Sequence, residues 1–365
     1  MQKVLTYFLL AVIVLGACSK DENPPPVGQP NNGLETGWTV PVDQLVLSQL
    51  PPDRIPSIDD PHFESLNNHN LSPQEIAYVY RHGNTVKVYP QNILWHHEIV
   101  NDQNGDHHFA VTFCPLTGSA VAWNREIDGV VTEFGVSGHL FNENLIPYDR
   151  NSQSFWSQMH LQSIKGISAG EELKSEFLLS TTGATIKTSF PNALVLVDTS
   201  GHHCDSVCRS LKSGLLLEGQ KNGSTFETLS GDYFGIVKVG QIKEPEALLF
   251  DYGVFGDSIN VFQTHFRSSR IVVAGSRNLQ FIVAFVDNSG NPENQFAPLH
   301  NELPVIMEDN YGNRYDISGL VVSGPAAGNR LPSPRAYTAH AFAWGLFFGN
   351  NIEFFEYAVP RVKHG

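Results

Sequence analysis

Alternating apolar and polar positions predict short β-strands through most of the chain after residue 75, because successive side chains of a strand point to opposite faces. The expected strands are residues 76–80, 86–89, 109–113, 119–123 and 130–136. His82-Gly83-Asn84, between the first two, is a hairpin signal. Residues 91–100, which follow Pro90, have the best helical pattern, and other helices are expected to be few and short. The pattern predicts a mainly β protein with a few short helices, an α+β fold.

Prolines dominate residues 51–61, ahead of the first predicted strand. Proline lacks a backbone N–H and interrupts both helices and central strands. We expect this segment to be an ordered arm that lies across the domain, with folding beginning near Gly37.

The N-terminus has the features of an export signal. Lys3 precedes an apolar run, residues 4–15, that is too short for a bilayer, since a spanning helix takes about 20 residues. Leu15-Gly16-Ala17-Cys18 resembles the lipobox of bacterial lipoproteins, in which lipid is attached to the cysteine. An ordinary signal peptide with an incidental Cys18 is the alternative.

The expected organisation follows from this signal. Residues 1–17 form a lipoprotein signal peptide, Cys18 is lipidated, and 18–36 are a flexible tether of low apolar content. The protein is then expected at the cell envelope, anchored in a membrane and facing the periplasm or the cell surface.

Composition narrows the partners. The chain of 365 residues has a formal net charge of −14, with 41% hydrophobic and 16% charged residues. A folded protein with this charge lacks the basic face that nucleic acid requires, so nucleic acid is excluded as a partner.

An internal repeat indicates two diverged tandem copies of one β-rich unit. The frame Gly-x-x-Ala-Gly-x-x-Leu occurs at Gly166 and again at Gly324, an offset of 158 (324 − 166). Residues 109–113 match 269–273 at an offset of 160 (269 − 109). We expect the N-terminal arm and first repeat at 37–198, a linker or insert at 199–231, and the second repeat at 232–365.

An ordered series of motifs resembles a prokaryotic family known only as a domain of unknown function, number thirty-one seventy-nine. The motifs are His97-Glu98-Ile99-Val100-Asn101-Asp102, the Cys114-Pro115-Leu116 motif with its flanking strand, Phe134-Gly135-Val136-Ser137-Gly138, Tyr148-Asp149-Arg150 and Ser154-Phe155-Trp156-Ser157-Gln158. The resemblance is good from about residue 37 to 198. It implies a site but no reaction, since the family has no established activity.

One departure from the family pattern is informative. Many members have a second cysteine where Thr117 stands. A two-cysteine redox or metal clip therefore cannot operate here. Either the shared chemistry needs Cys114 alone, or this member has lost it.

The candidate site consists of Cys114, His97, Glu98, Asp149 and Arg150. A thiolate at a strand end is a nucleophile or soft metal ligand, and an imidazole oriented by a carboxylate is a base or ligand. The guanidinium suits an anionic group. The structural alternative is that Cys114 packs in the core and Asp149-Arg150 form an ion pair at a turn. We expect Cys114→Ala to abolish function and leave the fold intact.

The remaining cysteines leave several options open. Cys204 and Cys208 are placed for a local disulfide in an oxidising compartment. A metal site with His202 and His203, or two free thiols, are the alternatives. In each case Cys114 is the odd thiol.

Two functional hypotheses remain. The first is an envelope protein with a ligand- or metal-binding, possibly catalytic, site around Cys114 in the first repeat. The second is a non-catalytic surface module that binds protein or glycan, with Cys114 in its core. The sequence names no cofactor and no small-molecule ligand.

Overall fold

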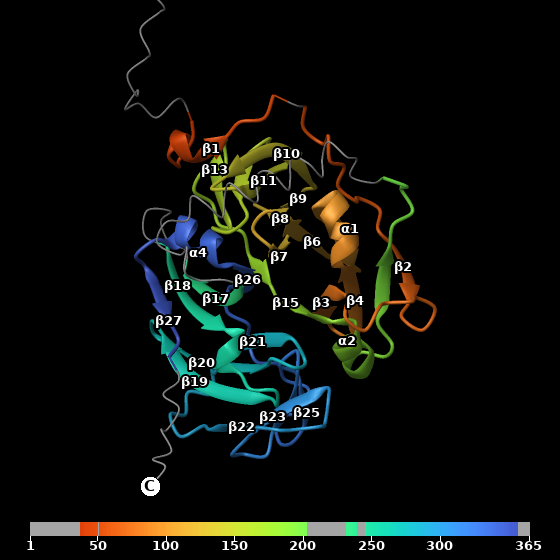
Figure 1. Ribbon diagram of the computed structural model, residues 1–365, viewed down its shortest axis with the longest axis vertical. Coiled ribbons are helices and arrows are strands. Elements are labelled where there is room, and N and C mark those ends of the chain that lie inside the picture. Colours follow the sequence, from red (N-terminus) through yellow and green to blue (C-terminus); the bar gives the residue numbers. More distant parts are fainter. Residues whose placement is uncertain (1–36, 50, 203–230, 239–244, 357–365) are drawn as a thin grey trace, which may run out of the picture. The chain divides into compact units, whose positions relative to one another are not determined.

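Short, mostly antiparallel strands are the main secondary structure of the protein in a computed structural model, which describes residues 37–49, 51–202, 231–238 and 245–356 (Figure 1). Residues Leu34–Gly365 form one compact unit. Three α-helices are seen in the described ranges, and none has the length and apolar character needed to cross a bilayer. The expected fold class, mainly β with a few short helices, is confirmed.

The first half, residues 37–202, contains three larger sheets and a two-stranded ribbon. The first sheet has the order β15-β3-β4-β16-β2, the second β14-β7-β6-β5 and the third β1-β10-β11-β12-β13, with β8 and β9 as the ribbon. The strands are β1 Leu45–Val46, β2 His62–Ser65, β3 Ile76–His82, β4 Thr85–Pro90, β5 Ile99–Asn104, β6 His107–Cys114, β7 Ser119–Asn124, β8 Glu126–Ile127, β9 Val130–Val131, β10 Phe134–Phe141, β11 Asn144–Asp149, β12 Phe155–Ser157, β13 Gln162–Lys165, β14 Ser175–Glu176, β15 Leu178–Thr182 and β16 Leu194–Val197. The helices are η1 Val42–Gln44, α1 Gln91–His97 and α2 Gly183–Ser189.

The second half, residues 231–356, contains three further sheets. Their orders are β26-β17-β18-β27, β19-β20-β21 and β22-β23-β24-β25. The strands are β17 Asp232–Lys238, β18 Glu246–Asp251, β19 Asn260–Phe266, β20 Ser269–Ser276, β21 Phe281–Val286, β22 Phe296–Pro298, β23 Val305–Asp309, β24 Arg314–Asp316, β25 Val321–Ser323, β26 Ala336–His340 and β27 Ile352–Phe354. The helices are η2 Tyr252–Val254 and α4 Ala341–Phe348.

Both halves connect their first sheets in the same way. A hairpin, β3–β4 or β17–β18, is flanked on one side by an antiparallel strand, β15 or β26. On the other side lies a parallel strand, β16 or β27. A short helix, α2 or α4, joins the two flanking strands. Parallel neighbours need such a crossover connection, which explains why each half places a helix there.

The two glycine frames have the same backbone structure. Gly166 and Gly324 have φ of 105° and 107°, and Gly170 and Gly328 have φ of 95° and 92°. The Gly170 N–H donates to the Ser163 carbonyl, as Gly328 donates to Val321. Side chains rarely adopt such φ values, so glycine is needed at these turns.

Two apolar clusters each contain buried residues from both halves. One apolar cluster joins Trp123 and Trp156 of the first half to Trp344 of α4. A second joins Ile186 of α2 to Phe281 and other residues of the second half. Each short helix therefore packs with strands of the opposite half, which couples the two halves through buried apolar surface.

The turns after β6 and β20 also contact the opposite half. The Thr117 carbonyl accepts from the backbone N–H of His340, at 2.8 Å. The Leu279 carbonyl accepts from the hydroxyls of Thr181 and Thr185, each at 2.9 Å. Thr117 and Leu279 hold the same place in their hairpins, so the contact is reciprocal.

Several sequence expectations need correction. The helix predicted over 91–100 ends at His97, because Glu98 is left-handed with φ of 60° and β5 begins at Ile99. The strand predicted over 130–136 is divided between β9 and β10. The predicted arm is confirmed. Residues 51–61 form no helix or long strand, and Ile58 makes a bridge to Val100.

The offset between the halves differs from 160 near Cys114. Strand β6 begins at His107 and β20 at Ser269, an offset of 162 (269 − 107). Cys114 therefore matches Ser276 rather than Ala274. A shift of two residues keeps every side chain on the same face of a strand, so the apolar pattern could not detect it.

Candidate functional site

Cys114 lies at the end of β6, where a turn of four residues leads to β7. It pairs with Ser119 across the hairpin, and its side chain is buried. The Sγ atom is 3.8 Å from the Glu143 carbonyl oxygen. Burial, with a further contribution from the Glu98 carboxylate, raises the pKa of the Cys114 thiol above its usual 9.0. The thiol is therefore protonated at neutral pH, which disfavours a nucleophilic role.

A buried polar cluster surrounds the turn beside Cys114. The Asn144 amide donates to Thr117 Oγ1 at 2.8 Å, to Ser119 Oγ at 3.0 Å and to Gln158 Oε1 at 2.8 Å. The Gln158 amide donates to Thr112 Oγ1 at 2.9 Å. The Asn144 Oδ1 atom is buried without a hydrogen-bond partner. Thr117 thus belongs to a hydrogen-bonded network that holds the turn.

His97 is the last residue of α1 and is almost fully buried. Its Nδ1 atom is 2.8 Å from the Pro56 carbonyl oxygen, and Nε2 is 3.4 Å from an Asp198 carboxylate oxygen. Burial raises the pKa of Asp198, but hydrogen bonds from Ser200 and His97 outweigh it and the pKa is lowered. His97 therefore fixes the arm and the end of the first half, rather than facing Cys114.

Glu98 forms the left-handed C-cap of α1, and its carbonyl accepts from the Phe113 N–H at 2.8 Å. This contact joins the helix end to β6. Of the predicted set, the structure brings Glu98 close enough to Cys114 for its charge to act on the thiol.

Asp149 and Arg150 lie at the far end of β11 from Asn144. Asp149 accepts from the N–H of Ser152 at 2.6 Å and from the Trp156 indole at 3.0 Å. Asp309 accepts similar bonds from the Asn313 N–H and the Tyr315 hydroxyl. The same bonding in both halves identifies Asp149 as a turn residue.

Arg150 holds the N-terminal arm. Its guanidinium is 2.6 Å from Asp59, 2.8 Å from Glu133 and 3.6 Å from Asp53. The tyrosine hydroxyl of Tyr148 donates to the same Asp53 at 2.6 Å. These carboxylates occupy the guanidinium N–H groups of Arg150, which an anionic ligand would need.

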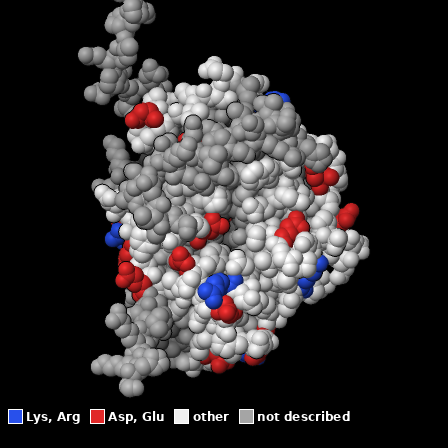
Figure 2. Space-filling model, viewed as in Figure 1, with Lys and Arg blue, Asp and Glu red and all other residues white. Residues whose placement is uncertain are grey.

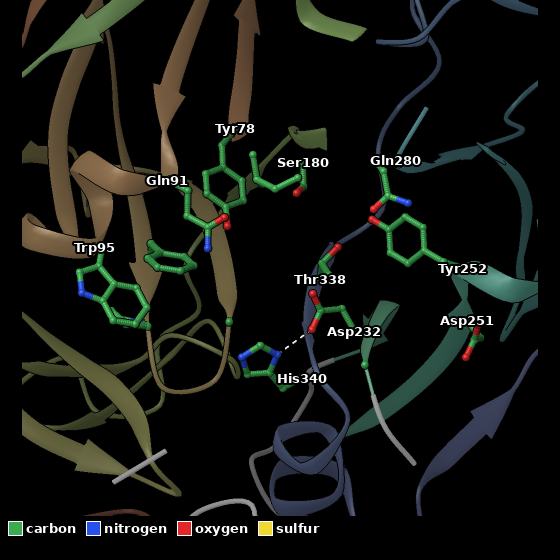
Figure 3. A pocket seen from close by; sticks show the side chains of 15 residues that line it. Tyr78, Gln91, Trp95, Ser180, Asp232, Asp251, Tyr252, Gln280, Thr338 and His340 are labelled. Atoms are coloured by element: carbon green, nitrogen blue, oxygen red, sulfur yellow. Dashed lines mark hydrogen bonds and ion pairs between the residues drawn. The ribbon is translucent and has the colours of Figure 1, made fainter. Parts of the chain in front are cut away.

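A cleft of about 460 Å³ lies where the two halves meet. The first half contributes Phe113, Pro115 and Gly118 from the turn after β6, with aromatic and polar side chains of the first sheet and α1. The second half contributes Asp232, Tyr252, Thr338 and His340 among others. Figure 3 shows these side chains converging from the two sides. The turn that begins at Cys114 is thus a wall of the cleft.

A hydrogen bond joins Asp232 and His340 in the lining of this cleft. The Nδ1 atom of His340 is 2.6 Å from Asp232 Oδ1 (Figure 3). Gly118 permits the arrangement, because a Cβ there would lie 2.5 Å from the imidazole ring. Gly118 also has φ of 61°, which favours glycine.

Sequence reasoning missed this pair. Asp232 and His340 are 108 residues apart, and no local motif marks either. The internal repeat was a signal in the sequence, but by itself it could not show that β26 lies opposite the turn after β6. That placement depends on how the two halves pack against each other.

The cysteine predictions fall largely outside the described residues. Cys18, Cys204, Cys208 and His203 belong to that undescribed part of the chain. Cys114 is a free, buried thiol. In the described ranges, no three histidine, cysteine or acidic side chains gather where they could hold a metal ion.

The fold and site define a β-rich protein with a polar cleft between two similarly connected halves. Residues 52–207 match the family model described as a protein of unknown function, DUF3179. No curated protein and no solved structure matches the chain. The expected family is confirmed over the segment that holds the turn after Cys114, and the family supplies no reaction.

Proposed function

We propose that this protein is an envelope lipoprotein whose folded part binds a small polar molecule in the cleft between the halves. The lipid anchor rests on the apolar run and the Leu-Gly-Ala-Cys motif at Cys18. Several acyl chains hold a protein at a membrane far better than one. The tether that follows then lets the folded part sample the space beside the membrane.

One observation carries the binding function. The turn from Pro115 to Gly118 forms one wall of the cleft, and the Asp232–His340 pair faces it from the other half. A concave site with few, convergent polar groups between two subdomains is the usual setting for a small ligand. The site proposed from the sequence around Cys114 therefore acts by shaping this wall.

Lipid attachment is tested by mass spectrometry of the N-terminal peptide of the mature protein. We expect a diacylglyceryl thioether on Cys18 in the wild type. Cys18→Ala should abolish both the modification and membrane retention. An unmodified N-terminus at any other residue contradicts the anchor but leaves the cleft untouched.

Ligand binding is tested by filling the cleft. Ser180 lines it, whereas Ser323 is exposed on the edge strand β25. We expect Ser180→Trp to abolish the binding of small polar fragments, detected by saturation-transfer NMR, and Ser323→Trp to have no effect. Equal fragment binding by both variants contradicts the proposal.

A thiol reaction at Cys114 is the second candidate and makes a different prediction. Because burial raises the pKa of this thiol, iodoacetamide at pH 8 should leave the Cys114 peptide unmodified until the protein is unfolded. Rapid native alkylation, measured by peptide mass spectrometry, would instead support the nucleophile.

We also propose that the halves descend from a tandem duplication. The shared strand order, the reciprocal turn contacts and the paired glycine frames support it. The cleft then lies where the copies meet, and its lining residues include matching positions, such as Gly118 and Gln280 in the two turns.

A further inference from the structure

The described residues that line the cleft include two carboxylates, those of Asp232 and Asp251, and neither lysine nor arginine. Amides and hydroxyls such as those of Gln91, Ser180 and Thr338 can serve in either role. A ligand rich in donors matches this inventory better than an anion does.

Four aromatic side chains complete the lining. Tyr78, Trp95 and Phe113 come from the first half and Tyr252 from the second. Figure 3 shows Trp95 and Tyr78 on one side of the cleft and Tyr252 on the other. The faces of such rings attract cations through their quadrupole.

Asp232 is one of the two carboxylates that line the described part of the cleft. One carboxylate oxygen bonds His340, and half of the Asp232 side chain is exposed. Burial is the main cause that raises the pKa of Tyr78, and the charge of Asp232 raises it further. Burial likewise raises the pKa of Tyr252 to about 12, again with a contribution from Asp232. Both phenol groups are therefore neutral and lie within reach of this carboxylate's field.

The charge of the whole protein acts in the same direction. The net charge is −14, and Figure 2 shows carboxylates at several places on the face viewed there, with fewer basic side chains. A negative field raises the local concentration of cations near a cleft.

Deepening the proposed function, on which it rests, we infer that the cleft binds a small organic ammonium ion, with Asp232 as its charge partner and the aromatic rings around its carbon skeleton. An ammonium group donates three hydrogen bonds and accepts none, which matches the lining. The cleft volume of about 460 Å³ lies in the range of small-molecule sites.

The test uses three probes of one shape and different charge. Binding of 2-phenylethylamine, 2-phenylethanol and phenylacetate to the purified full-length protein is measured at pH 7 by saturation-transfer NMR and calorimetry. D-glucose serves as a neutral polar probe. We expect the amine to bind about tenfold more tightly than the alcohol, and phenylacetate not to bind.

Two carboxylate variants locate the effect. Asp232→Asn should weaken amine binding about tenfold and leave the alcohol unchanged. Asp257→Asn removes the same charge from an exposed side chain that pairs with Arg277, and should change neither. Circular dichroism and thermal melting check that both variants fold. The charge series on the wild-type protein decides the inference even if Asp232→Asn does not fold.

The outcomes separate this inference from the proposed function. If the alcohol, phenylacetate or glucose binds as tightly as the amine, the ammonium ligand is wrong and the cleft remains a binding site. Amine binding that Asp232→Asn leaves intact also overturns the inference. If no probe of any charge binds, both proposals fail.

Discussion

The two halves share their strand connections but place different side chains behind the turns after β6 and β20. In the first half Thr112, Thr117 and Ser119 form a hydrogen-bonded cluster. The matching positions of the second half are Ala274, Leu279 and Phe281, which pack in or against an apolar core. A backbone frame can thus keep its turns and registers while its interior changes from polar to apolar.

The difference also shows what a polar interior requires. Buried polar groups are costly unless they are hydrogen-bonded, and the first half meets that requirement with Asn144 and Gln158. This half supplies the turn that borders the cleft. We infer that the polar cluster keeps that turn in position.

The largest expected effect tests whether the halves are independent. Trp344 is fully buried, stacks on Tyr337 and lies in a core shared with the first half. Trp344→Ala should cost about 3–5 kcal/mol of stability, because it leaves a large cavity. Urea unfolding followed by circular dichroism should show one transition, shifted to lower denaturant. Separate unfolding transitions for the two halves would contradict a core that both halves share.

Acidification should destabilise the protein through His160 of the first half, whose place in the second half corresponds to that of Ser318. Burial lowers the pKa of His160 from 6.5 to about 4. Between these values the unfolded chain binds a proton that the folded protein does not, so stability falls as pH falls. The loss from pH 7 to 4 should reach about 3 kcal/mol.

Two histidine variants test the cause of this pH effect, and both keep the other titrating groups. His160→Leu should remove much of the slope of stability against pH, measured by urea unfolding at several pH values. His265→Leu, at an exposed position, should keep the wild-type slope. A wild-type slope in His160→Leu would show that other groups cause the acid sensitivity.

The polar cluster itself can be compared across the halves. Asn144→Ala removes an amide NH2 group whose two hydrogens are shared among three buried acceptors, so it should cost about 2–3 kcal/mol. The Ser276 hydroxyl donates to the Asp257 carbonyl and accepts from the Leu279 N–H, and Ser276→Ala should cost about 1 kcal/mol. Equal losses in chemical denaturation would argue against a cooperative network in the first half.

The smallest effect on stability concerns the two turns. Gly118 and Gln280 both have positive φ, 61° and 52°, but only Gly118 lies against the His340 ring. Gly118→Ala should cost about 1–2 kcal/mol and weaken ligand binding by displacing His340. Gln280→Gly should change stability by less than about 1 kcal/mol in either direction. Thermal melts and NMR binding assays of both variants make the comparison.

Much of the local structure followed from the sequence. The sequence predicted the hairpin β3–β4 and the strands β6 and β7, and Pro90 marked the start of α1. The prolines of residues 51–61 indicated the arm. The helix end was missed because Glu98 adopts a left-handed conformation that no local pattern requires. The sequence predicted a site at Cys114, and the structure places the turn after it beside a cleft, but the groups of the second half that face this turn were not predicted.

The sequence by itself determined the family, the β-rich class, the glycine turns and the expectation of a lipid anchor, because these depend on short-range patterns and motifs. Only the tertiary structure decided that His97 and Arg150 hold the arm, that Cys114 is buried, and that His340 and Asp232 face Gly118. These relations join residues far apart in the chain. They depend on how the two halves pack against each other. That packing is established by the burial of apolar surface from both halves.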